Sequence, residues 1–222
     1  MSVIRVENLN KSIKGKVILE DLSFTVERGD CLALIGPNGA GKTTLMDCLL
    51  GDRKVTSGII KIEGKAPGHP QLKDSVSYLP QENAIVQKLT VQELISFFRS
   101  IYPNPLTVND IDDLLRFTPE QKKQLASKLS GGQKRLLSFV LTLIGRPNLL
   151  FLDEPTAAMD TSTRQRFWEI VGHLKDQGVT IVYSSHYIEE VEHTADRILV
   201  LHQGYLLRDT TPLAMRSEEV EK

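Results

Sequence analysis

The feature of this sequence that most constrains its fold is a glycine-rich loop between an apolar run and an expected helix. The apolar run, residues 31–35, is typical of a strand buried on both faces of a sheet. The expected helix begins at about Lys42, runs to Leu50 and is closed by Gly51. The joining loop matches the phosphate-loop pattern in full and consists of Gly36, Pro37, Asn38, Gly39, Ala40, Gly41, Lys42 and Thr43. Because strand, loop and helix follow in the order that a phosphate-binding loop needs, the sequence predicts an α/β protein that binds a nucleotide.

The phosphate loop (residues 36–43) carries side chains suited to phosphate and metal binding. Its glycines allow backbone N–H groups to converge on phosphate oxygens, and the helix that follows adds the positive end of its dipole. Lys42 is expected to reach the β- and γ-phosphates, and the Thr43 hydroxyl to ligate Mg²⁺. Thr44, the next residue, is included among the nucleotide-binding residues. The alternative is a glycine-rich turn that binds nothing, which the flanking strand and helix disfavour.

A pair of acidic residues, Asp153 and Glu154, ends a second apolar run at residues 149–152. Functional groups are expected at the carboxyl ends of parallel strands. Two adjacent carboxylates after apolar residues are costly unless a cation lies near, so Asp153 is expected to hold Mg²⁺, through water. A strand-end turn with solvated acids is the alternative. The upstream phosphate loop and the following Pro155-Thr156 argue against it.

A pair of adjacent glycines stands within residues 129–133, which read Leu-Ser-Gly-Gly-Gln. Ser130 and Gln133 have the spacing of a helix capping box, so a well-capped helix is one interpretation. Gly131 and Gly132, however, weaken a first helical turn by about 1 kcal/mol each relative to alanine. Their use is close approach of the backbone to an anion at the positive end of the helix. The sequence therefore predicts a second anion-binding turn.

The order of the phosphate loop, residues 129–133 and the paired acids resembles that of the ATP-binding cassette, the motor subunit of ABC-type transporters. The resemblance covers about residues 3–213. The resemblance implies that the chain binds ATP and Mg²⁺, and that Glu154 is the base that orients or deprotonates the attacking water. It further implies that Gln81 contacts Mg²⁺ and this water, and that His186 bonds the γ-phosphate and positions the acid. Without this order, a glutamine after proline and a lone histidine would be read as ordinary loop or surface residues.

The resemblance also implies that the chain works as a pair with a second ABC ATPase subunit, in a homodimer or a heterodimer. Residues 129–133, here called the signature turn, would then close over ATP held by the other subunit. Asp160 matches the loop that crosses the same interface. Ile13 stands where the family usually places an aromatic residue against adenine. Since base stacking on an aromatic ring is worth ~1–3 kcal/mol, an aliphatic residue there is expected to hold adenine more loosely.

The expected fold class is α/β, with a P-loop NTPase core, a mostly parallel central sheet, an N-terminal antiparallel β portion and an inserted α-helical subdomain. Residues 1–222 form a single ABC ATPase domain in this interpretation. Its core comprises residues 1–81 and 146–222, and residues 82–145 form the helical insertion that carries the signature turn. Capping boxes are expected where two helices of the insertion begin, at Thr90 with Glu93 and at Thr118 with Gln121.

Composition and hydropathy narrow the range of partners. Lys and Arg number 27 against 28 Asp and Glu, so no overall charge recruits nucleic acid or an anionic membrane. The longest apolar stretch, residues 136–144, falls far short of the ~20 residues that span a bilayer. Residues 1–7 lack the features of an export signal, so a cytoplasmic location is expected. The resemblance implies a peripheral position on the inner face of the plasma membrane, bound to membrane-spanning permease subunits.

Two further function classes compete with a transport ATPase. One is a non-transport ABC ATPase that acts on nucleic acid or is the scaffold of a membrane complex. Such proteins usually carry two cassettes, coiled coils or zinc modules, which this sequence does not display. The other is a simple P-loop kinase, which the signature turn disfavours. Within transport, residues 78–82 and 89–94 resemble the drug- and antibiotic-efflux branch and favour export, although import and the identity of the substrate stay open.

A candidate surface for the membrane partner lies in the insertion. Ala84, Ile85 and Val86, together with residues 89–98, form an apolar-rich segment. These residues either dock a cytoplasmic helix of the permease or pack inside the insertion.

Overall fold

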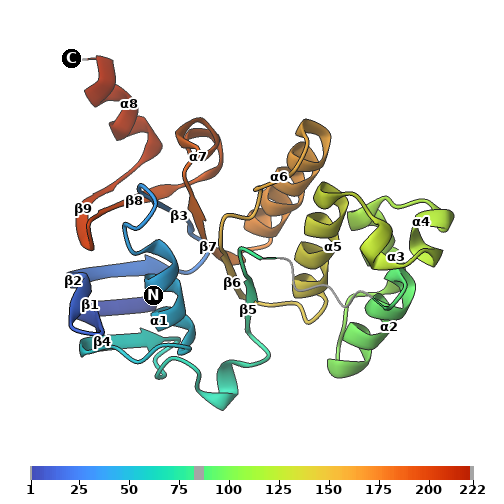
Figure 1. Cartoon of the computed structure of the whole chain (residues 1–222), viewed down its shortest axis with the longest axis horizontal. Coiled ribbons are helices and arrows are strands. Elements are labelled where there is room, and N and C mark those ends of the chain that lie inside the picture. Colours follow the sequence, from blue (N-terminus) through green and yellow to red (C-terminus); the bar gives the residue numbers. More distant parts are fainter. Residues whose placement is uncertain (1, 83–87, 221–222) are drawn as a thin grey trace.

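The strands of the protein form two sheets in the computed structural model, which describes residues 2–82 and 88–220 (Figure 1). The smaller sheet is antiparallel and 3-stranded, in the order β2-β1-β4. Its strands are β1 (Ser2–Ile13), β2 (Lys16–Glu27) and β4 (Ser57–Ile62). The larger sheet is 6-stranded, in the order β5-β6-β7-β3-β8-β9, and only its edge strand β9 runs antiparallel to its neighbour. Its strands are β3 (Cys31–Ile35), β5 (Val76–Leu79), β6 (Leu149–Leu152), β7 (Thr180–Ser185), β8 (Arg197–His202) and β9 (Tyr205–Thr210).

Strands β3, β6 and β7 form the centre of the larger sheet, and every one of their residues is buried. Continuous apolar runs suit this position because helices or a second sheet cover both faces. Along β3, Ala33 and Ile35 pack into a cluster with the helical side of the molecule, whereas Leu32 and Leu34 pack with the antiparallel sheet. The two sequence expectations, a mostly parallel central sheet and an antiparallel N-terminal portion, are confirmed.

Helix α1 (Lys42–Leu50) begins directly after the phosphate loop and lies between the two sheets (Figure 1). It ends at Gly51, whose φ of 87° is left-handed, as the sequence predicted. The cluster that contains Leu45, Met46 and Leu49 of α1 also contains the buried residues of β1 and β2. The remaining helices of the α/β part are α6 (Thr161–Asp176), α7 (Ile188–Thr194) and α8 (Pro212–Val220).

The helices of the predicted insertion lie together at the end of the molecule opposite the antiparallel sheet (Figure 1). They are α2 (Val91–Ile101), α3 (Val108–Leu115), α4 (Pro119–Lys123) and α5 (Gly131–Leu143). Short 3₁₀ turns occupy Pro70–Leu72 and Ala126–Lys128. Each of α2 to α5 begins with a complete capping box. The boxes at Thr90, Thr118 and Ser130 were predicted, and the one at Thr107 with Asp110 was not.

The apolar segment of the insertion divides into a packed and an exposed part. Ala84, Ile85 and Val86 lie outside the described residues. In α2, Val91, Leu94 and Ile95 are buried, whereas the exposed fraction of Phe97 and of Ile101 is 56% each. No helix within residues 2–82 and 88–220 is both long and apolar enough to span a membrane.

Candidate functional site

Four strands of the larger sheet deliver the predicted site residues to one edge. Strands β5, β6, β7 and β3 are parallel neighbours, so their carboxyl ends meet at the same edge. The last residues of adjacent strands pair with one another, as in Leu79 with Leu152 and Ile35 with Ser185. The segments that leave this edge are the phosphate loop after β3, Gln81 after β5, Asp153 and Glu154 after β6, and His186 after β7.

One side of the phosphate loop packs so closely against neighbouring strands that its backbone requires glycine. A Cβ atom on Gly36 would lie 2.2 Å from the carbonyl oxygen of Leu201, and one on Gly41 would lie 2.6 Å from Cδ2 of Leu19. At Gly39, by contrast, a Cβ atom would meet nothing within 4 Å. Both Gly39 and Gly41 have positive φ angles, of 81° and 105°, which other residues rarely adopt. The loop therefore keeps an open side while its other side packs on β2 and β8.

The first turn of α1 is available to an anion. Its N-cap is Gly41, so no side chain caps the helix, and its first turn carries no acidic residue. Uncapped N–H groups and the positive dipole end together favour a bound phosphate. Lys42 is 6% exposed, and its Nζ donates hydrogen bonds to the carbonyl oxygens of Gly36 (2.6 Å) and Pro37 (3.2 Å). Thr43 is exposed and Thr44 half-buried in the same turn.

Asp153 is buried and joins the phosphate loop to the end of β7. Its exposed fraction is 1%. The Thr43 hydroxyl donates to Oδ2 of Asp153 at 3.0 Å, and the Ser184 hydroxyl donates to Oδ1 at 2.5 Å. A hydroxyl and a carboxylate side by side are hard oxygen donors, and Mg²⁺ usually binds through one or two carboxylates plus substrate phosphates. The residues present thus fit the Mg²⁺ ion that the sequence predicted.

Glu154 is the point on which Gln81 and His186 converge. Nε2 of Gln81 donates to Oε2 of Glu154 at 3.1 Å, and Nδ1 of His186 lies 3.5 Å from Oε1. The backbone of Glu154 is left-handed, with φ of 45°, and its N–H donates to the Ser184 hydroxyl at 2.8 Å. Two residues that lie far apart in the sequence, Gln81 and His186, are therefore adjacent to the carboxylate of Glu154. A left-handed conformation at a residue other than glycine is a form of strain that is frequent at functional sites.

The signature turn begins α5 and packs against the loop that carries Asp160. Ser130 accepts a hydrogen bond from the N–H of Gln133 at 3.2 Å, and the Gln133 side chain accepts one from the N–H of Ser130 at 3.0 Å. A Cβ atom on Gly132 would lie 3.2 Å from Oδ2 of Asp160, and one on Gly131 would lie 3.9 Å from the carbonyl oxygen of Ala158. The turn therefore lies against the same loop that the sequence assigned to the subunit interface.

Asp160 itself is the N-cap of α6. Its carboxylate accepts hydrogen bonds from the N–H and hydroxyl of Thr163, both at 2.9 Å, and from the Ser162 hydroxyl at 2.7 Å. The bond from the Thr163 N–H is the largest of the causes that lower the pKa of Asp160 to about 2. Within the subunit, the side chain is thus engaged in capping its own helix.

Ile13 lies at the end of β1, beside the turn that leads into β2. It is half-buried and pairs with Lys16 across the hairpin. Further along β2, the side chain of Leu19 is the nearest neighbour of the Gly41 Cβ position. The hairpin that carries Ile13 is therefore continuous with the strand that supports the phosphate loop.

Two residues near the strand ends were missed by the sequence interpretation. Ser184 links Asp153 to the backbone of Glu154, and its only signal was a serine at the end of a buried strand ahead of His186. Arg135 is 1% exposed on α5, and its signal was a charged residue on a face that otherwise buries Leu136 and Phe139.

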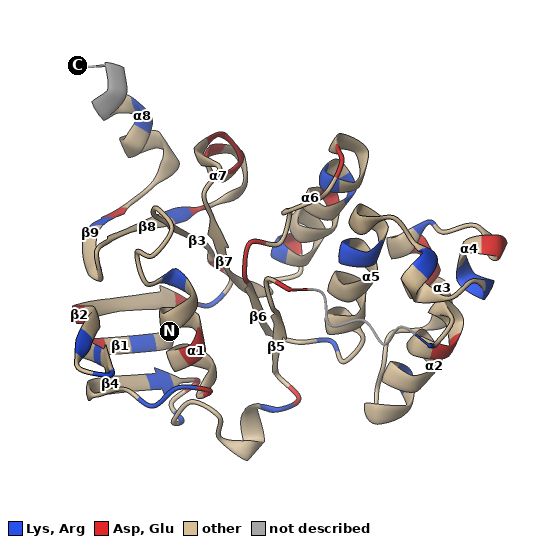
Figure 2. Ribbon diagram, viewed as in Figure 1, with Lys and Arg blue, Asp and Glu red and all other residues tan. Residues whose placement is uncertain are grey.

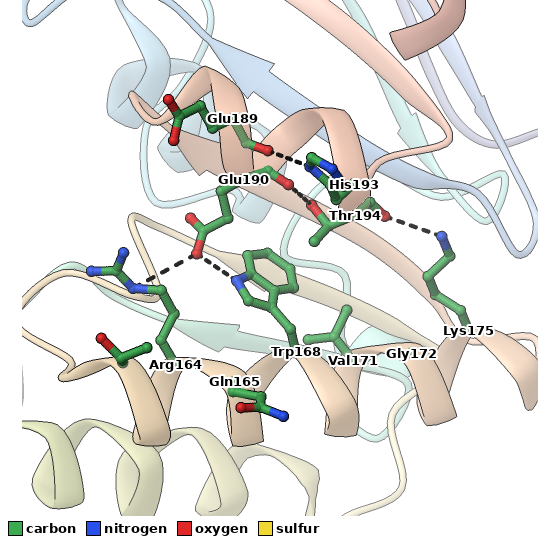
Figure 3. A pocket seen from close by; sticks show the side chains of 11 residues that line it. Arg164, Gln165, Trp168, Val171, Gly172, Lys175, Glu189, Glu190, His193 and Thr194 are labelled. Atoms are coloured by element: carbon green, nitrogen blue, oxygen red, sulfur yellow. Dashed lines mark hydrogen bonds and ion pairs between the residues drawn. The ribbon is translucent and has the colours of Figure 1, made fainter.

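A cavity of about 660 Å³ lies between α6 and α7 and is lined by side chains of both helices (Figure 3). Glu190 stands in its wall and accepts hydrogen bonds from Trp168 Nε1 and from the Thr156 hydroxyl, the latter at 3.0 Å. The guanidinium of Arg164 lies 5.5 Å from the ring centre of Tyr187, whose ring is 4.1 Å from that of His186. These contacts fix α7, and with it the end of the His186 loop, on α6.

Comparison with known proteins shows which proteins this chain resembles. The sequence matches the family model described as ABC transporter over residues 19–157. It is 36% identical to the Nod factor export ATP-binding protein I of Rhizobium sp. (strain N33), over 98% of this chain and 73% of that protein. It is 35% identical to ABC transporter G family member 23 of Dictyostelium discoideum over 95% of this chain, but spans only 31% of that protein's length. A solved structure described as the ATP binding subunit of an ABC transporter superposes with a TM-score of 0.86 at 26% identity, over 99% of this chain and 94% of that one.

Proposed function

The chain belongs to the ABC transporter family of ATP-binding proteins, and on this basis we propose that it drives an exporter whose membrane-spanning permease is a separate chain. Binding and hydrolysis of ATP follow from family membership. Export is favoured because the Rhizobium relative is named for the export of Nod factor. A separate permease is favoured because the same name describes an ATP-binding protein. The transported compound is chosen by the permease in this proposal.

The convergence of Gln81 and His186 on Glu154 is the observation that carries the proposed mechanism. The phosphate loop and the first turn of α1 bind the ATP phosphates, and Lys42 exchanges its carbonyl partners for phosphate oxygens. Thr43 and Asp153, with Gln81 beside them, would hold Mg²⁺, which would supply positive charge to the β- and γ-phosphates.

Glu154 accepts the proton of the attacking water or orients that water toward the γ-phosphate. Its carboxylate is oriented by the amide of Gln81 and the imidazole of His186, which also reaches the γ-phosphate. General bases act within hydrogen-bond distance of the proton they remove. Gln81, Glu154 and His186 all follow the carboxyl ends of neighbouring strands, which keeps them within reach of one phosphate.

The complete site requires two subunits in this proposal. The signature turn, residues 129–133, binds the γ-phosphate of ATP held by a second ABC ATPase subunit, and Asp160 lies at the same interface. The adjacent glycines in the first turn of α5 and their packing against the Asp160 loop support this arrangement. The partner subunit is a second copy or a related chain.

The permease contacts the helical insertion, residues 82–145, in this proposal, with the chain peripheral on the inner face of the plasma membrane. The exposed side chains of Phe97 and Ile101 on α2 support an apolar contact there. Nucleic acid is not an expected partner, because the net charge is −1 and Figure 2 shows basic and acidic residues interspersed over the sheets and helices.

The substitution Glu154→Gln tests the proposed function. It is expected to slow ATP hydrolysis by ~10³ or more, about 4 kcal/mol of barrier, and to leave ATP binding unchanged. It should also yield a dimer on a sizing column only when ATP is present. Glu189→Gln is the matched control, because Glu189 is an exposed acid at the start of α7. Normal hydrolysis by the Glu154→Gln protein would contradict the proposal.

A further inference from the structure

Arg135 is a buried cation close to the carboxyl ends of the parallel strands, where the predicted site residues lie. It lies in the second turn of α5 and is 1% exposed. Burial is the main influence on its pKa, which is lowered to about 10 although the nearby Asp153 carboxylate opposes that shift. An arginine is retained in such a place only when its donors are satisfied, because an unpaired buried charge is strongly unfavourable.

The guanidinium donates to four backbone carbonyl oxygens that belong to two different loops. Nη2 donates to the carbonyl oxygens of Asp153 at 2.8 Å and of Glu154 at 3.3 Å, and Nε donates to the carbonyl oxygen of Pro155 at 2.9 Å. Nη1 donates to the carbonyl oxygen of Pro80. The planar fork of an arginine can serve all of these acceptors at once, whereas the single ammonium group of a lysine cannot.

These carbonyl groups determine where the catalytic carboxylate points. The carbonyls of residues 153–155 include both peptide groups that flank the left-handed Cα of Glu154. The carbonyl of Pro80 immediately precedes Gln81, whose side chain donates to Glu154. Arg135 therefore fixes the main chain on both sides of the hydrogen bond between Gln81 and Glu154.

We propose that Arg135 is a positioning residue for ATP hydrolysis, which holds the backbone of Glu154 and of the Gln81 loop in register with the helix that begins at the signature turn. It touches neither ATP nor the attacking water. The inference rests on the proposed function, specifically on Glu154 as the base. Its rival is a buried arginine that contributes to folding alone.

The test compares Arg135→Lys and Arg135→Met in the full chain, with hydrolysis rates divided by the concentration of ATP-binding sites so that unfolded protein is not counted. Displacement of a catalytic group by about 1 Å can cost ~100-fold in rate, so kcat should fall by about that factor with the Kd for ATP unchanged. Arg166→Met is the control, since Arg166 likewise donates to backbone carbonyls, those of Asp113 and Leu114, at the seam between α6 and α3. If Arg135→Met does not fold, the kcat of Arg135→Lys, which keeps the buried charge, tests the inference.

A double-mutant cycle with Glu154→Gln separates positioning from general damage. If Arg135 acts through the Glu154 carboxylate, Arg135→Lys should slow the wild type ~100-fold and the Glu154→Gln protein hardly at all. An equal fold-loss in both backgrounds, or a normal kcat per binding site for both Arg135 variants, would overturn the inference. Normal hydrolysis by Glu154→Gln alone would instead overturn the proposed function, so the two failures are distinguishable.

Discussion

The hydroxyl of Ser184 shows how single residues organise this site. It donates to the carboxylate of Asp153 and accepts from the backbone N–H of Glu154, so one oxygen atom links the predicted metal ligand to the predicted base. Asp153 is at the same time bonded to Thr43 of the phosphate loop. The Asp153 carboxylate and the backbone of Glu154 are thus both bonded to the buried hydroxyl of Ser184, which holds them in place before ATP arrives.

The sequence predicted roles for residues with reactive side chains but not for the residues that hold them. Lys42, Asp153 and Glu154 stand in recognisable local patterns, and the parallel sheet brings their segments to one edge. Ser184 and Arg135 act on a backbone N–H and on backbone carbonyl groups. Any segment supplies such partners, so no spacing in the sequence reveals them.

The adenine contact yields a prediction at this scale. Ile13→Tyr is expected to lower the Kd for ATP by the equivalent of ~1–3 kcal/mol, because an aromatic ring would stack on the base. Val17, 54% exposed and two residues into the facing strand, provides the comparison as Val17→Tyr. Affinity is measured by titration of the full chain with ATP. If the Kd is unchanged for Ile13→Tyr but lower for Val17→Tyr, the prediction is contradicted and the adenine contact is assigned to β2.

Helix starts were the most predictable elements, because a capping box depends only on residues within one turn. Ser130 and Gln133 made such a box in the sequence and make it in the structure. The box of Thr107 with Asp110 was missed, since the usual signature has Glu or Gln in the fourth position. The order of strands in the larger sheet, with β3 between β7 and β8, depends on contacts across the whole chain and has no such local signal.

The signature turn carries the prediction at the scale of elements. Ser130→Arg should abolish the ATP-dependent dimer of the Glu154→Gln protein, because a long cation would occupy the path of the partner's phosphate. The Kd of the isolated subunit for ATP should stay the same, since the phosphates of the ATP that it binds are expected to contact the phosphate loop and α1 and not the signature turn. Dimer formation is followed on a sizing column and ATP binding by titration.

The control for that experiment is Thr107→Arg, which removes an equivalent cap from α3 at about 1 kcal/mol of stability. Its ATP-dependent dimer should survive. Loss of ATP binding by the monomeric Ser130→Arg protein would contradict a site that is shared between subunits.

For the molecule as a whole, the phosphate loop and the signature turn pack against different elements. The phosphate loop is supported by β2 and β8, whereas the signature turn rests on the loop that carries Asp160 and on the helices around α5. The arginine at position 135 is the described side chain that bonds to both catalytic loops from the helix of the signature turn. Closure of a partner on that helix would therefore be transmitted to the backbone of Glu154.

Stability at low pH is the prediction that belongs to the whole chain. Carboxylates at helix starts, among them Glu93, Asp110 and Asp160, accept backbone N–H bonds that lower their pKa, that of Asp160 from 3.8 to about 2. A folded-state pKa below the unfolded value means that the unfolded chain binds protons first as the pH falls. The stabilisation is thus complete above the unfolded pKa values and is lost between about pH 4 and pH 2.

The free energy of unfolding, measured by urea titration, should therefore decrease as the pH is lowered through that interval. The triple variant Glu93→Gln, Asp110→Asn and Asp160→Asn keeps acceptor oxygens at all three helix starts but removes the titrating groups, so its stability should fall less steeply with acid. The box of Thr118 uses Gln121, but the pKa of Glu120 in the same turn is also lowered by hydrogen bonds, so the triple variant should keep part of the acid dependence. Equal acid dependence in the wild type and the triple variant would assign the loss to other carboxylates.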